Sequence, residues 1–320
     1  MSFLSTSEGC CDFCGSAQFP LLDPVLLREQ FELLAGIYIR DDNGRTLVEW
    51  MQEDWLIFNS TALNSHQMRA LLSEILDDGE IVRQKFVPQS NGDIDVSERW
   101  QEFRLELMHA NRYFPESAID MMDLKELLEH LVIKSENAPQ EWFRGRICLD
   151  NPFTQQQMSS PPKHLASHGR ANPAGIPYLY MASTEQTAVS EIRPHTGEAV
   201  TIAKASLRGD LIFADLRNPR KTISPFLIGD EEKIKKTRNF IGFLELLGRE
   251  LTRPVLPRSA AFDYAPSQYL CEFIKKCNYS GVIYSSSVGD GFNLALFDPS
   301  LADINNVYQK LVSRVSVIIE

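Results

Sequence analysis

Apolar residues recur every three or four positions through much of residues 21–138, which is the spacing of amphipathic helices. In the last such stretch, Leu124, Leu127, Leu128 and Leu131 form one apolar stripe. Polar turns, including the proline- and glycine-containing residues 88–92, separate the stretches. The spacing predicts helices over residues 26–37, 47–58, 68–76, 100–114 and 124–132. We therefore expect residues 21–138 to form an all-α N-terminal domain with no β-sheet of its own.

The rest of the chain mixes short strand-like runs with helical spacing. Runs rich in β-branched and aromatic residues predict strands over residues 143–149, 178–182, 200–207, 282–285 and 293–297. Helical spacing is present over residues 231–252 and 266–277. Strands and helices do not alternate regularly, which favours an α+β fold over repeated βαβ units.

Residues 169–194 (GRANPAGIPYLYMASTEQTAVSEIRP) are the most informative segment. Its prolines and glycines indicate a loop, and the aromatic run that follows indicates a short strand. Ser183 followed by Gln186 matches a capping box that begins a helix, and Pro194 ends it. The segment therefore predicts a loop, a strand and a helix in immediate succession.

Glu191 is unusual within that helix. It lies in the last turn, where a carboxylate faces the negative end of the helix dipole at a cost of about 0.3–1 kcal/mol. It also lies at the edge of the apolar stripe formed by Ala188, Val189 and Ile192. Such local conflicts are concentrated at functional sites, although a salt bridge with Arg193 or another cation would also explain this one.

Further motifs occur in order around this segment. Residues 142–146 read WFRGR and contain Arg144, and two prolines at 161–162 precede the loop. Residues 281–286 read GVIYSS, where the register from Tyr284 selects Ser286, and residues 291–298 read GFNLALFD. Several spaced motifs in fixed order are a specific signal. On these residues the chain resembles the RES family, named for an arginine, a glutamate and a serine, over about residues 139–300.

The resemblance implies a RES domain over residues 139–320, with a fold similar to the ADP-ribosyltransferases. It also implies an enzyme that consumes NAD by cleaving the nicotinamide–ribose bond, with NAD as substrate rather than as a bound cofactor. The implied site has four catalytic residues, Arg144, Tyr180, Glu191 and Ser286, and two substrate-binding residues, Arg170 and Asn293. No metal belongs to this implied site.

In the implied mechanism, the glutamate stabilises the oxocarbenium-like ribose and the tyrosine stacks on nicotinamide. The arginines bind the pyrophosphate or a ribose, and the serine hydrogen-bonds the glutamate or the substrate amide. Transferases that modify arginine carry a second acid or glutamine two residues before the glutamate, where this chain has Val189. This favours NAD breakdown by water or phosphate, in a toxin or defence role that an antitoxin or regulatory protein could restrain. ADP-ribosyl transfer and a non-enzymatic interaction module are the alternatives.

Charge divides the chain unequally. The net charge is −11, with −14 in residues 1–138 and +3 in residues 139–320. The acidic part disfavours nucleic acid as a partner, whereas the other part tolerates an anionic dinucleotide. The change in charge and a polar stretch at residues 135–139 place the domain boundary there. No apolar run approaches 18 residues, the first residues do not match a signal peptide, and the six cysteines suit a reducing compartment. We therefore expect a cytoplasmic protein that does not bind membranes.

Two weaker motifs lie before the boundary. Cys11 and Cys14 form a C-x-x-C pair in residues 1–20, which supplies two ligands of a tetrahedral zinc site, or two reduced thiols without a metal. Longer RES proteins often carry such a knuckle followed by a helical domain described as HEPN-like, which is the interpretation of residues 21–138. Arg104 and His109 match the R-x4-H ribonuclease signature of other HEPN domains, but the acidic surroundings argue against RNA cleavage.

Overall fold

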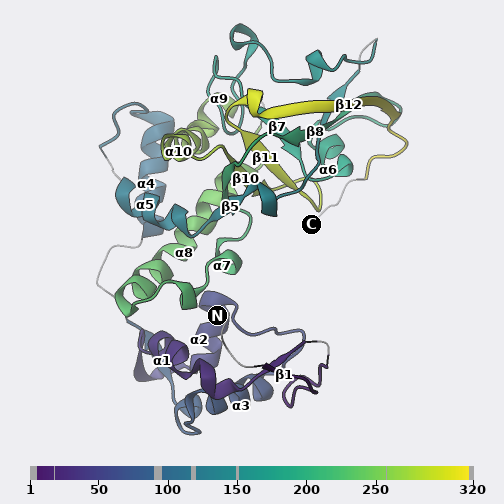
Figure 1. Cartoon of the computed structure of the whole chain (residues 1–320). Helices are drawn as coiled ribbons and strands as arrows, with labels where there is room; N and C mark the ends of the chain where they lie inside the picture. Colours follow the sequence, from purple (N-terminus) through teal and green to yellow (C-terminus); the bar gives the residue numbers. More distant parts are fainter. Residues whose placement is uncertain are drawn as a thin grey trace. The chain divides into compact units, whose positions relative to one another are not determined.

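The computed structural model describes residues 6–17, 19–89, 96–116, 120–148, 151–256 and 258–316. The chain divides into two compact units, and many of their elements are labelled in Figure 1. Unit 1 comprises residues 1–95 and 220–242, and unit 2 comprises residues 96–219 and 243–320. Residues 96–138, which the sequence assigns to the N-terminal domain, therefore cluster with unit 2. The cause is long-range packing, because a strand at residues 132–134 pairs with a strand of the main sheet.

Unit 1 is mainly helical. The helices are α1 (Arg28–Ala35), α2 (Leu47–Trp55), α3 (Ser65–Leu76) and the first part of α8 (Glu231–Thr252). The short helix α7 (Pro219–Thr222) lies at the boundary between the units. Unit 1 also contains two small antiparallel sheets, β1 (Thr6–Ser7) with β2 (Leu21–Leu22), and β3 (Tyr38–Arg45) with β4 (Phe86–Pro88). The prediction of no β-sheet before residue 138 is therefore wrong.

The composition of β3 does not predict a strand. It reads YIRDDNGR, whose acidic, asparagine and glycine residues favour turns over strands. Its pairing is nonetheless fixed by β4, with Tyr38 opposite Pro88 and Ile39 opposite Val87. The indole Nε1 of Trp50 in α2 also donates to the carbonyl oxygen of Phe86 at 2.7 Å. Tertiary contacts therefore overrode the local preference.

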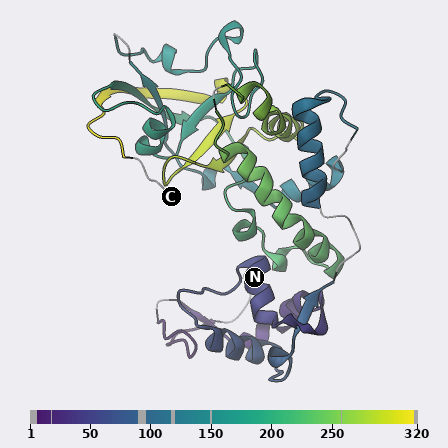
Figure 2. The same ribbon diagram turned by 180° about the vertical axis from the view of Figure 1, so that it is seen from behind.

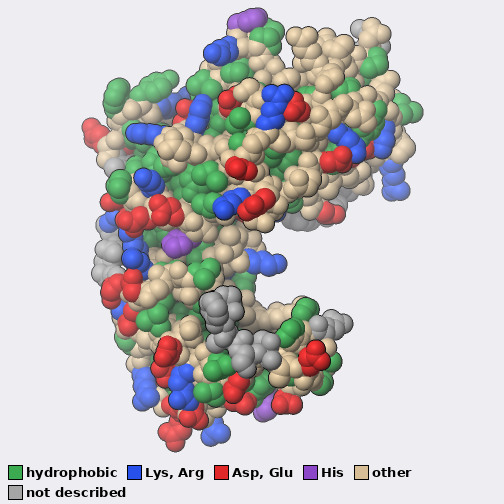
Figure 3. All heavy atoms as spheres, viewed as in Figure 1, with side chains coloured by type: hydrophobic (Ala, Val, Ile, Leu, Met, Phe, Trp, Pro, Cys, Tyr) green, Lys and Arg blue, Asp and Glu red, His purple; other side chains and the backbone are tan. Residues whose placement is uncertain are grey.

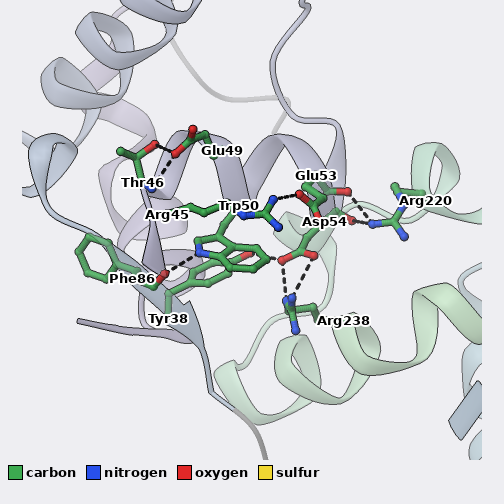
Figure 4. A network of polar contacts seen from close by, with 10 residues as sticks. All are labelled: Tyr38, Arg45, Thr46, Glu49, Trp50, Glu53, Asp54, Phe86, Arg220 and Arg238. Atoms are coloured by element: carbon green, nitrogen blue, oxygen red, sulfur yellow. Dashed lines mark hydrogen bonds and ion pairs between the residues drawn. The ribbon is translucent and has the colours of Figure 1, made fainter. Parts of the chain in front are cut away.

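A buried polar network joins residues 220–242 to the rest of unit 1 (Figure 4). Asp54 is buried, and its carboxylate accepts from Arg238 Nε at 2.5 Å and from Tyr38 Oη at 2.9 Å. Burial and the Asp54 charge raise the pKa of Tyr38 well above its usual value, so the phenol stays a donor. Arg220 Nη1 donates to the carbonyl oxygen of Glu53 at 2.6 Å. These contacts explain why a segment so distant in sequence clusters with the N-terminal residues.

Unit 2 is built on an eight-stranded sheet with the order β12-β8-β6-β7-β11-β10-β9-β5. Only the β9–β10 pair is parallel, and the other neighbours are antiparallel. The strands are β5 (Val132–Lys134), β6 (Trp142–Ile147), β7 (Leu179–Ala182), β8 (Ala199–Leu207), β9 (Ile212–Asp215), β10 (Gly281–Ser285), β11 (Phe292–Leu296) and β12 (Ala302–Leu311). The mixed sheet confirms that this part of the chain combines α and β structure.

The helices of unit 2 are α4 (Val96–His109), α5 (Met121–Glu129), α6 (Glu185–Glu191), the second part of α8, α9 (Ala260–Asp263) and α10 (Ala265–Lys276). Figures 1 and 2 both show α4, α5 and α10 together beside one part of the sheet. The short helix α6 instead packs against β6, β7 and β8. None of the helices among the described residues is long and apolar enough to cross a membrane.

The two faces of the central strands differ in character. Met181, Ile283 and Leu294 occupy adjacent register positions on β7, β10 and β11, and all three belong to a buried hydrophobic cluster. Because side chains alternate along a strand, Tyr284 and Asn293 point to the opposite face. One face of the strands thus builds the core, and the other carries polar and aromatic groups.

The helices expected in the N-terminal part are all present, although α1, α2, α4 and α5 end earlier than predicted. Five expected strands match β6, β7, β8, β10 and β11, except that Leu149 lies outside the described residues. The strands β5, β9 and β12 were not predicted. The strand β12 reads ADINNVYQKL, and its polar residues do not give the apolar alternation of a typical strand. It is an edge strand that pairs along β8.

Candidate active site

A cavity of about 300 Å³ opens in unit 2 on the polar face of the sheet. Its wall combines residues from β6, β7, β10 and β11 with the end of α6 and the loop before β7. Five of the six predicted site residues line it, namely Arg144, Arg170, Tyr180, Glu191 and Asn293. The sixth, Ser286, contacts this set through a hydrogen bond to Glu191. The structure therefore brings all six residues together, although they span more than 140 positions of the sequence.

The Glu191 carboxylate is oriented by two donors from neighbouring segments. Its Oε1 accepts from Ser286 Oγ at 2.7 Å and from Asn293 Nδ2 at 2.6 Å. No described residue donates to Oε2, and none forms an ion pair with Glu191, so the salt bridge to Arg193 is not formed. One carboxylate oxygen is thus fixed, while the other is available to a ligand in the cavity.

Close packing of α6 on β6 places this carboxylate. A Cβ atom on Gly145 would lie 2.9 Å from the carbonyl oxygen of Ala188, so a larger residue would push the helix away.

The helix α6 is capped by Thr184, whose side chain accepts from Thr187 N, and the predicted Ser183–Gln186 capping box is wrong. Ser183 Oγ instead accepts from Phe292 N on β11 at 3.0 Å. Ser183 does not cap α6 because its hydroxyl accepts from the neighbouring strand β11 instead.

Tyr180 holds the preceding loop through its hydroxyl. That group donates to Asn172 Oδ1 at 2.7 Å and accepts from Ala171 N at 2.9 Å. Asn172 Nδ2 in turn donates to carbonyl oxygens of the same loop, including that of Ile176 at 2.9 Å. Burial raises the pKa of Tyr180 well above its usual value, so the phenol is not a base at neutral pH. Tyr180 therefore contributes its ring to the cavity, because its hydroxyl is bonded to the loop.

Arg144 provides positive charge to the wall of the cavity. Because β6 pairs with β7 only at Phe143–Ala182, the Tyr180 carbonyl oxygen is left to accept from Arg144 Nη1 at 2.8 Å. Burial and the nearby Arg146 lower the pKa of Arg144 to about 10, which leaves the guanidinium charged at neutral pH. Its Nε is buried, and no described residue accepts from it. A buried, charged and incompletely paired donor is suited to an anion.

Arg170 reaches the cavity from the loop before β7. Its guanidinium lies 5.7 Å from the centroid of the Tyr264 ring, and its Nη1 donates to the carbonyl oxygen of Arg253. These contacts hold the side chain without neutralising its charge. Arg144 and Arg170 together bring positive charge to the wall of the cavity.

Tyr284 is a cavity residue that the sequence reasoning used only to fix a register. It is buried on β10 directly opposite Asn293, and no described residue hydrogen-bonds its hydroxyl. Burial raises the pKa of Tyr284 well above its usual value. Its position two residues before Ser286, within a motif already identified, was the signal that could have revealed it. Tyr178, by contrast, lies outside this cavity and hydrogen-bonds Glu272 at 2.5 Å.

A family model for the RES domain matches residues 142–314, which is more than half of the chain and includes every residue of the cavity wall. The chain belongs to the RES domain family. A search of curated proteins gives no match. Among solved structures, the chain is similar to the M. tuberculosis MbcT–MbcA toxin–antitoxin complex, with 14% identity and a TM-score of 0.36 over 60% of this chain and 93% of that chain. A similarity this low says nothing about the function of this RES protein.

The two weaker motifs receive different support. Cys11 lies in a tight turn in which backbone N–H groups of Cys14 and Phe13 lower its thiol pKa. Within the described part of the chain, however, no group of three or more Cys, His, Asp or Glu residues could hold a metal, so the zinc prediction gains no further ligands. Arg104 of the R-x4-H motif is buried and pairs with Glu250 at 2.8 Å. The HEPN-like interpretation of the N-terminal helices stays a prediction.

Proposed function

We propose that this RES domain cleaves the bond between nicotinamide and ribose in NAD, and that it acts as a toxin or defence enzyme by depleting NAD. The observation that carries the proposal is the pairing, in one cavity, of an oriented carboxylate with two incompletely paired arginines. Glu191 presents a free Oε2, while Arg144 and Arg170 supply positive charge to the same space. A substrate that is cationic at one end and anionic further along matches this distribution of charge.

The chemistry requires little acid–base assistance. The nicotinamide nitrogen is already cationic, so it leaves as a neutral ring when the C1′–N bond breaks and takes the bonding electron pair. Positive charge then develops on the ribose, and Glu191 Oε2 stabilises it. Water adding to C1′ releases one proton and yields ADP-ribose. Phosphate adding at the same carbon yields the corresponding 1-phosphate.

The remaining residues act by binding and positioning. The Tyr180 ring stacks on nicotinamide, because its hydroxyl is used to hold the loop at Asn172. Arg144 and Arg170 bind the anionic part of the substrate. Ser286 donates to Glu191, and no described histidine hydrogen-bonds its hydroxyl, so we assign it no nucleophilic role. Asn293 Nδ2 also donates to Glu191, so we revise the role of Asn293 from substrate binding to positioning of the carboxylate.

ADP-ribosyl transfer to a protein is the alternative reaction. The helix α6 presents Val189, rather than an acid or amide, two residues before Glu191, so no side chain at that position can orient an acceptor. This favours a small acceptor such as water or phosphate. A protein inhibitor that covers the cavity would restrain the enzyme, as expected for a toxin with an antitoxin.

The proposal is tested by following the label from NAD that carries an isotope in its adenine ring. Purified protein should convert the label to free ADP-ribose in water or to its 1-phosphate in phosphate buffer, as identified by mass spectrometry. Label attached to protein would instead establish the transferase. NAD recovered intact under all of these conditions would contradict both reactions and favour a non-enzymatic interaction module.

A further inference from the structure

Two more cavities lie in unit 2, with volumes of about 300 Å³ and 520 Å³. Both are lined by Arg249 and Thr252 from the end of α8 and by Ser285 at the end of β10. The larger one also includes Arg253, Ser286 and Ser287. Because they share three residues, we treat the two as one surface and call it the arginine groove.

The arginine groove adjoins the candidate active site at two points. Ser286 lines the groove, and its hydroxyl donates to Glu191, which lines the active-site cavity. Arg170 lines the active-site cavity, and its Nη1 donates to the carbonyl oxygen of Arg253 in the groove. The two cavities therefore adjoin each other through a wall that Ser286 and Arg170 help to form.

The groove contains acids as well as arginines, because Glu245 and Glu250 also line it, and Glu250 pairs with Arg104 at 2.8 Å. Two of its arginines nevertheless have no acidic partner among the described residues. Arg249 and Arg253 are exposed and four residues apart, and no described residue pairs with either guanidinium. Like charges at this spacing repel each other by a few tenths of a kcal/mol. The end of a helix offsets part of that cost, because its dipole favours cations, but it leaves both guanidinium groups free for a ligand. Arg217, in contrast, is already paired with Asp215 at 2.6 Å.

Packing fixes Arg249 in the groove. The preceding residue, Gly248, lies so close to the backbone after β9 that a Cβ atom there would be 2.4 Å from the Leu216 carbonyl oxygen. The last turns of α8 are thereby held against the segment that forms the opposite wall. Leu246 and Pro254 add apolar surface beside the charges. An apolar wall with arginines at its rim suits a nucleoside that carries phosphate groups.

Size supports the same conclusion. The active-site cavity, at about 300 Å³, lies at the lower end of the range of roughly 300–1,000 Å³ that ligand pockets span. That volume leaves part of a dinucleotide to be bound elsewhere. We propose that the arginine groove binds the adenosine diphosphate half of the substrate through Arg249 and Arg253, while nicotinamide and its ribose occupy the active-site cavity. This inference rests on the proposed function and specifies how a dinucleotide, rather than a nucleoside, is selected.

Binding of ADP-ribose, measured by calorimetry, tests the groove without requiring turnover. Arg249→Gln should weaken that binding by about tenfold, the lower end of the effect of losing a hydrogen bond to a charged group. Arg249→Lys should recover part of the loss, because it keeps the charge. Arg99→Gln, an exposed arginine on α4 that lines none of the three cavities, is the matched control and should bind as the unaltered protein does. Thermal melts should show that all variants are folded.

A second arm compares the cleavage of NAD with that of nicotinamide riboside, which has no phosphate. Arg249→Gln should raise the KM for NAD by about tenfold with little change in kcat, since it removes contacts made equally before and during reaction. Cleavage of nicotinamide riboside should be unaffected. Equal ADP-ribose affinities of the unaltered and Arg249→Gln proteins would overturn the groove assignment, as would a loss confined to binding of inorganic phosphate. Absence of NAD cleavage, with the ADP-ribose difference intact, would instead refute the reaction and leave the groove as a nucleotide site.

Discussion

Replacing Glu191 by glutamine removes the charge that the proposed mechanism needs while keeping the side chain in place. Oε1 of the glutamine can still accept from Ser286 and Asn293, which now hold Glu191 at 2.7 Å and 2.6 Å. The amide nitrogen then takes the position of Oε2 and faces the developing ribose cation. The substitution therefore changes the electrostatics at the reacting carbon and little else.

The expected loss follows from that single change. Removing one preorganised electrostatic group from an active site lowers kcat by a factor on the order of 10²–10³, or about 2.7–4 kcal/mol. KM should change much less, because the cation exists only near the transition state. Stability should be unchanged or slightly higher, since a carboxylate at the end of α6 opposes the helix dipole.

The assay is the initial rate of nicotinamide release from NAD, with Glu102→Gln as the control. Glu102 is an exposed acid on α4, and its loss should leave both kcat and the melting temperature unchanged. Near-normal turnover by folded Glu191→Gln protein would refute the electrostatic role. A large drop in its melting temperature would show instead that Glu191 is a structural acid.

Three other changes test neighbouring parts of the account. Asn293→Leu should lower kcat about tenfold with KM nearly constant, because it removes one donor that orients the catalytic carboxylate; a rise in KM alone would restore a substrate-binding role. Asp54→Asn should lower the free energy of unfolding by about 3 kcal/mol in chemical denaturation, since it leaves the arginine partner in unit 1 without its counter-charge. Alkylation followed by mass spectrometry should show the Cys11 thiol reacting at lower pH than Cys277, because the backbone N–H groups of Cys14 and Phe13 lower the pKa of Cys11 from 9.0 whereas burial raises that of Cys277 from 9.0. Equal pH profiles for the two thiols would contradict that assignment.

Local sequence carried enough information for the elements that surround the site. The aromatic and β-branched runs at β7 and β10 are strong strand signals, and α8 has the bounds that its periodicity predicts. The motif residues also indicated which side chains belong together. The sequence does not reveal the geometry of these side chains. In particular, it does not show that the Asn293 amide donates to Glu191 rather than to a ligand.

The failures have a common physical origin in long-range contacts. The polar strand β3 exists because β4 pairs with it, and Ser183 does not cap α6 because Phe292 N uses its hydroxyl. Residues 220–242 cluster with unit 1 through the pair between Asp54 and Arg238, which has no local signature. Such contacts are decided by the folded state, so periodicity and propensity do not reveal them.

The most direct test of the central claim is a time course of NAD, followed by proton NMR, in the presence of purified protein. The account predicts that the nicotinamide ring signals of NAD are replaced by those of free nicotinamide in equal amount, and that Glu191→Gln protein slows this exchange at least a hundredfold. NAD signals that persist unchanged with the unaltered, folded protein would contradict it.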